Sequence, residues 1–160
     1  MQALTILAHR FPDSSEAAAA LSTFHDRFAG NALVIDKWFS VQATIPGAKA
    51  LDRVLKLMDN PQFKRTNPNR VRALVGTFAF GNPTGFGRAD GEGYRFLARE
   101  ILDIDARNPQ LAARILTSMR SWRSLEPARA EHARKALTEI AEAPALSTDV
   151  RDIVERTLKG

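Results

Sequence analysis

The sequence contains no cysteine. This absence excludes disulfide bonds and thiolate metal sites, and it is common in proteins of a reducing compartment. No apolar run approaches the roughly 20 residues that a helix needs to cross a bilayer. The first 30 residues also lack a basic start followed by a long apolar block, so we expect no signal peptide, no membrane partner and a cytoplasmic location.

The motifs of the common catalytic classes are also missing. There is no HExxH zinc motif, no GxSxG nucleophile turn and no P-loop. The three histidines, His9, His25 and His132, form no pair at i, i+4. His132 falls on a polar helix face, where an exposed side chain is expected, and His25 lies near a predicted helix end, where it can contact the helix dipole. The residues alone therefore predict no catalytic group and no metal site in this chain.

Strand signals are weak, because no useful stretch alternates apolar and polar residues and no Asn-Gly hairpin occurs. Helix signals are frequent instead. Four of the eight prolines follow an asparagine, and Asn is a good N-cap while Pro suits the first helical turn. This pattern predicts helix starts at Asn67, Asn82 and Asn108.

The remaining helices are predicted from caps and apolar spacing. A helix is expected to begin at Asp13 or Ser14 and to end at Gly30, and another is expected to begin at Asp90. The other predicted helical segments are 2–10, 31–45, 47–60, 108–122, 126–143 and 147–159.

Apolar residues at helical spacing indicate which faces are buried. The expected core stripes are Val71, Leu74, Val75 and Phe78 after the first Asn-Pro start; Leu111, Ile115, Met119 and Trp122 after the last; Leu51, Val54, Leu55 and Met58 in 47–60; and a broad face with Leu33, Val34, Trp38, Phe39 and Val41 in 31–45. The stretch 80–94 holds five of the nine glycines, which indicates a complex turn or a close approach of backbone to its neighbours.

Short helices with short connections predict an all-α fold. We expect antiparallel helix pairs stacked into a superhelical array of the HEAT or armadillo kind, with residues 1–160 forming a single helical domain. The sequence shows no exact repeat, so this architecture depends on helix number and length.

The charges are mixed along the chain. There are 23 Lys and Arg against 18 Asp and Glu, and no basic run exceeds two residues. This distribution favours solvated helix faces over a dedicated nucleic-acid surface. The net charge of +5 still leaves an alternative open: a free-standing helical-repeat module that binds protein or nucleic acid.

Three stretches carry a family resemblance: NALVIDKWFSVQAT, NPNRVRALVGTFAFGNPTGF and DGEGYRFLAREILDIDARNPQLAARIL. They resemble the C-terminal domain of bacterial aminopeptidase N, the zinc-dependent alanyl aminopeptidases, and the resemblance runs from about residue 3 to the end. It implies that the zinc ligands and the catalytic groups belong to a catalytic domain outside this sequence. It also implies that this chain is inactive alone, that it needs no cofactor itself, and that its partners are the other domains and peptide substrates.

The resemblance further implies that this domain caps the active-site chamber. By position, Arg72 and Arg114 resemble chamber-lining arginines that attract the carboxylate end of a short peptide. Both lie off the apolar stripes of their helices, so the core does not need them. Composition alone favours an exposed or ion-paired role for any such arginine, and that structural interpretation is kept for Arg70, Arg88, Arg107 and Arg120.

Overall fold

A computed structural model describes all 160 residues, and every regular element in it is a helix. The all-α expectation is confirmed. The chain falls into two compact units, Met1–Gly85 and Phe86–Gly160, and each is described here by itself. None of the helices combines the length and the apolar character that crossing a membrane requires.

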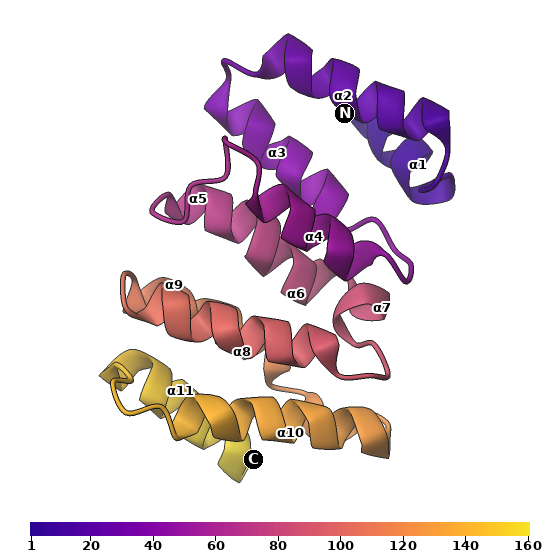
Figure 1. Ribbon diagram of the computed structural model, residues 1–160. Coiled ribbons are helices and arrows are strands. Elements are labelled where there is room, and N and C mark those ends of the chain that lie inside the picture. The colour runs from indigo at the N-terminus through magenta and orange to yellow at the C-terminus, as the bar shows by residue number, and fades with distance from the viewer. The chain divides into compact units, whose positions relative to one another are not determined.

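The first unit is centred on α3. Its elements are α1 (Gln2–Arg10), α2 (Ser15–Phe28), α3 (Ala32–Ala43), α4 (Ala50–Met58), α5 (Pro68–Val71), a π-helical turn (Arg72–Gly76), α6 (Thr77–Gly81) and α7 (Pro83–Phe86) (Figure 1). Helix α3 packs against α1, α2, α4 and the continuous helical segment 68–81. The core contains the fully buried side chains of Ile35, Phe39, Leu74 and Phe78.

The second unit consists of two helix pairs. Its elements are α8 (Glu92–Asp105), α9 (Pro109–Leu116), the 3₁₀ turns Thr117–Met119 and Trp122–Ser124, α10 (Pro127–Ala141) and α11 (Thr148–Lys159). Helix α8 packs on α9 and α10, and α11 packs on the same two helices. The buried carboxylate of Asp105 accepts hydrogen bonds from Ser147 N at 2.8 Å and from Ser147 Oγ at 2.5 Å, so the end of α8 is tied to the start of α11.

The Asn-Pro interpretation is confirmed. The Asn67 and Asn108 side chains accept hydrogen bonds from Asn69 N at 2.9 Å and Leu111 N at 3.0 Å, which caps α5 and α9. Asn82 precedes α7 and does more than start it. Its buried amide Nδ2 donates to Ala43 O at 2.8 Å and to Ile45 O at 2.9 Å, so it also satisfies carbonyls at the end of α3.

Several local expectations are wrong. Helix α8 begins at Glu92 after Gly91, because the Asp90 carboxylate accepts from Glu92 N and lies outside the helix. Helix α9 ends at Leu116, and Trp122 falls on a separate 3₁₀ turn. The π-helical turn was not expected, since it leaves no local sequence signal.

Two inward-facing assignments also fail. Leu33 is 70% exposed, and in α4 the residue that is buried is Leu57, while Leu55 is 43% exposed. The buried face of α4 therefore runs through Leu51, Val54 and Leu57. Helical spacing is satisfied by either leucine, so the packing against α3 decides between them.

The glycine-rich stretch shows the expected close approaches. A Cβ on Gly93 would lie 1.9 Å from the carbonyl oxygen of Phe86, which leaves no room for any side chain. Gly91 has φ +76, and a Cβ there would lie 2.5 Å from the ring of His132. His132 is therefore half-buried against this loop, which makes it a partly exposed surface histidine that packs on the backbone of Gly91.

Candidate functional site

Arg70 is a structural residue. Only 6% of it is exposed, its Nε donates to Gln62 O at 3.0 Å and its Nη1 donates to Ala32 O at 3.0 Å. It also forms an ion pair with Asp36 of α3. The guanidinium therefore connects the loop before α5 to the first turn of α3. Its donors are used in these contacts and are not available to a ligand.

Arg72, two residues further on, makes none of these contacts. It is exposed and is the first residue of the π-helical turn. Its carbonyl accepts the backbone N–H of Thr77, five residues on, and its Nη1 donates to Asn69 Oδ1 at 2.9 Å. No carboxylate pairs with this guanidinium. Single π-helical turns recur at functional sites.

Arg114 is exposed on α9, whose buried side chains include Leu111 and Ile115. Its guanidinium makes no hydrogen bond and no ion pair. Its carbonyl accepts the Thr117 hydroxyl at 2.7 Å, at the point where α9 changes to a 3₁₀ turn. The side chain is thus available to an external anion.

The two arginines belong to different units, Arg72 to the first and Arg114 to the second. Both are exposed and lack a carboxylate partner. Each also lies in or near a turn that is not α-helical, the π-helical turn for Arg72 and the 3₁₀ turn Thr117–Met119 for Arg114.

Many other basic side chains are paired with nearby carboxylates. Arg107 pairs with Asp103, and Arg88 pairs with Asp90 at 2.7 Å. The hydrogen bond from Arg88 is the main cause that lowers the pKa of Asp90 below its ordinary value. Further pairs at i, i+3 or i, i+4 are Arg95–Glu92, Arg129–Glu126, Arg134–Glu131, Arg156–Asp152 and Lys159–Glu155. These pairs reduce the positive charge that is free to meet a polyanion.

No group of three or more His, Cys, Asp or Glu side chains in the structure could hold a metal ion. The residues of this chain therefore do not fit a zinc site of their own.

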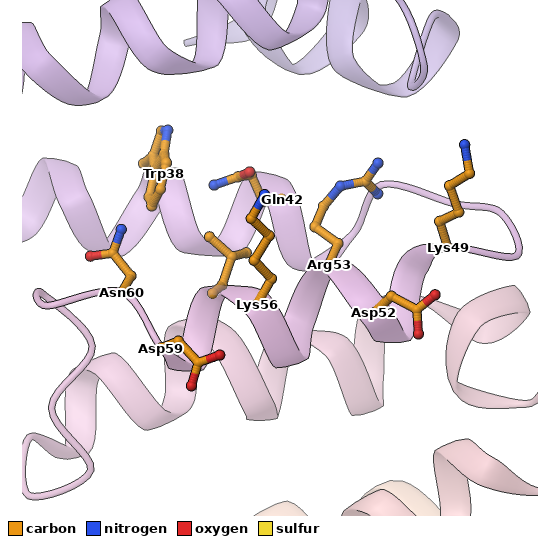
Figure 2. Close-up of a pocket in the computed structure, with 9 residues that line it drawn as sticks. Trp38, Gln42, Lys49, Asp52, Arg53, Lys56, Asp59 and Asn60 are labelled. Atoms are coloured by element: carbon orange, nitrogen blue, oxygen red, sulfur yellow. The ribbon is translucent and has the colours of Figure 1, made fainter.

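A polar groove in the first unit was not predicted from the sequence. The groove lies beside α3 and α4, has a volume of about 900 Å³ and is lined in part by Trp38, Gln42, Arg53 and Lys56 (Figure 2). Gln42 is buried on the otherwise apolar face of α3. A polar residue within an apolar stripe was the one available sequence signal.

The chain matches a family model over residues 1–159, described as "Domain of unknown function (DUF3458_C) ARM repeats". It is 45% identical to aminopeptidase N of Caulobacter vibrioides over 87% of this chain, and 37% identical to aminopeptidase N of Escherichia coli over 88% of it. Each match spans 16% of the relative's length.

A solved structure, that of Legionella pneumophila aminopeptidase A in complex with aspartic acid, superposes with a TM-score of 0.90 at 33% identity. That match covers 98% of this chain and 18% of the solved one. The resemblance to aminopeptidase N inferred from the sequence is confirmed, and the ARM-repeat description agrees with the helix pairs of both units.

Proposed function

The chain belongs to the DUF3458_C family of ARM-repeat domains, and on this premise we propose that it serves as the C-terminal domain of a zinc aminopeptidase. The whole enzyme removes N-terminal residues such as alanine from peptides in the cytoplasm. Residues 1–160 act as one domain that covers the active-site chamber. Zinc bound by the catalytic part supplies the Lewis-acid chemistry.

The observation that carries this proposal is the state of Arg72 and Arg114. Both guanidinium groups are exposed, lack a carboxylate partner and are not needed by the core. In the proposed enzyme each of these guanidinium groups attracts the carboxylate end of a short peptide whose amino end is at the catalytic centre.

A guanidinium suits this role for physical reasons. Its planar fork can donate two parallel hydrogen bonds to one carboxylate. In a closed chamber with little water the attraction between the two charges is several times stronger than in bulk solvent. The contribution of this chain is thus orientation and charge, which act on substrate binding.

Exposed apolar side chains give the proposal a second support. Ile6, Phe11, Leu33 and Phe80 are each more than half exposed. Large apolar side chains are often buried where domains of one polypeptide meet. We infer that neighbouring domains of the enzyme cover these four side chains.

The experiment compares two substrates in the whole enzyme. Arg72→Ala should raise KM for short peptides with a free carboxylate by about tenfold or more, because a charge-assisted hydrogen bond contributes roughly 1.5–3 kcal/mol. Small alanyl amides, which lack that carboxylate, should be affected much less. Arg10→Ala is the matched control, since Arg10 is an exposed arginine of the same unit.

Equal effects of Arg72→Ala on both substrates would contradict the carboxylate role. The 160-residue chain should hydrolyse no alanyl substrate by itself, and hydrolysis that copurifies with it would contradict the assignment as an accessory domain.

A further inference from the structure

Two adjoining hollows of the first unit meet at Gln42 and Arg53. The larger is the groove beside α3 and α4, and a smaller one of about 350 Å³ extends towards α2. Both are lined by Trp38, Gln42, Arg53 and Asn60. Figure 2 shows Gln42 rising from α3 and Arg53 from α4 into this space. None of the arginines assigned to substrate above contributes to it.

Two buried donors here have no partner. Gln42 is 8% exposed and its Nε2 makes no hydrogen bond; the buried Nη1 of Arg53 makes none either. A donor held away from water without an acceptor is costly. Trp38 Nε1, which also lines the groove, donates to Leu21 O at 2.9 Å. Among the buried side-chain nitrogen and oxygen atoms that line the groove, only Gln42 Nε2 and Arg53 Nη1 lack a partner.

The charges around the pair are balanced, so the two donors, and not the net charge of the groove, decide which ligand fits. Lys49 is paired with Asp13 at 3.1 Å, and the remaining charged lining residues are Arg53 and Lys56 against Asp52 and Asp59. Because the second charge of a dianion would meet as many carboxylates as cations, a dianion gains no advantage over a monoanion here.

Burial of the Arg53 guanidinium has a desolvation cost that nearby charges do not fully offset. Loss of solvent lowers the pKa of Arg53 from its ordinary value, and the charge of Asp13 opposes that effect only in part. An anion placed next to the guanidinium would offset the cost of its burial.

We propose that this groove is a carboxylate-binding site in which Gln42 Nε2 and Arg53 Nη1 donate hydrogen bonds to the ligand. Figure 2 shows the amide nitrogen of Gln42 on the side of Trp38 and the Arg53 guanidinium on the side of Lys49. A carboxylate has two oxygens, so it can accept hydrogen bonds from donors on opposite sides of the ligand. The apolar wall of Trp38 and Leu57 accommodates the carbon atoms that carry the carboxylate.

The first test is a titration of the protein with sodium acetate at constant ionic strength, followed by NMR of the Gln42 side-chain amide and the Arg53 guanidinium. Both signals should shift and saturate in the millimolar range. Gln42→Met and Arg53→Gln should each weaken binding by about tenfold, and Arg53→Lys should recover only part of it, because an ammonium lacks the planar fork. Arg151→Gln is the matched control, since it removes an exposed arginine of the other unit and should leave the titration unchanged.

Two blocked tripeptides identify the source of the carboxylate. One carries only an aspartate side chain between an acetylated N-terminus and an amidated C-terminus, and the other carries only a free C-terminal carboxylate. Tighter binding of the first assigns the site to an acidic side chain, and tighter binding of the second assigns it to a peptide end.

Three results would overturn the proposal. Shifts that grow linearly with acetate and never saturate would show that the two donors are satisfied by water. Inorganic phosphate that binds as tightly as acetate would show that the groove responds to charge and not to a carboxylate. Unchanged affinity in both Gln42→Met and Arg53→Gln would place the bound acetate elsewhere.

Discussion

Replacement of Arg70 by methionine tests how the first unit is held together. Arg70 donates to Gln62 O and Ala32 O at 3.0 Å each and pairs with Asp36, whose side chain is 19% exposed. Methionine keeps much of the side-chain volume but leaves two carbonyls and one largely buried carboxylate without their donor. Breaking a buried pair from one side costs about 3–5 kcal/mol, and we take about 3 kcal/mol because Asp36 retains some contact with water.

The assay is thermal and urea unfolding of Arg70→Met beside Arg72→Met. In a chain of this length a loss of about 3 kcal/mol lowers Tm by roughly 6–12 °C. Arg72→Met removes an exposed arginine two residues away and should change stability by about 0.5 kcal/mol or less. Adding Asp36→Leu to Arg70→Met should restore part of the loss, since both partners of the pair are then gone. Equal losses in the two methionine variants would refute this account of the helical segment 68–81.

Three further predictions concern the second unit and the charges. Gly93→Ala should destabilise the protein by about 1–3 kcal/mol or more in urea unfolding, because the new Cβ would lie 1.9 Å from Phe86 O. Gly30→Ala is the control and should be close to neutral in the same assay, because a Cβ there has nothing within 4 Å. Asp105→Ala should cost about 2–3 kcal/mol, since it removes both acceptors of Ser147, and urea unfolding that gives wild-type stability would contradict that role. A fluorescent RNA or DNA probe should show no salt-sensitive binding at moderate salt, because no basic run exceeds two residues and many basic side chains are paired with carboxylates. A clear shift would favour the free-standing binding module.

Helix starts could be predicted from the sequence because their signals are local. The caps at Ser14, Asn67, Asn108 and Ser147 depend on a side chain and a backbone N–H three or fewer residues away. Such contacts form whatever the rest of the chain does.

Features that depend on tertiary contacts could not be predicted. Leu55 and Leu57 fit helical spacing about equally, and only the packing of α4 on α3 exposes the first and buries the second. The burial of Arg70 depends on acceptors at Ala32 and Gln62, which are distant in sequence or lie in an irregular loop.

The candidate site shows the same division. Spacing placed Arg72 and Arg114 off the apolar stripes, and both are exposed, but only the family resemblance distinguished them from other exposed arginines. Gln42 and Arg53 were missed, because their unpaired donors appear only when α3 and α4 are brought together.

The most direct measurement is the ratio of kcat/KM for two matched substrates in the whole enzyme, an alanyl dipeptide with a free C-terminal carboxylate and its carboxamide. The wild-type enzyme should prefer the free acid. In the Arg72→Ala/Arg114→Ala double variant that preference should fall by about tenfold or more, while the rate for the carboxamide stays near wild type. An unchanged ratio would contradict the claim that this domain positions the carboxylate end of the substrate.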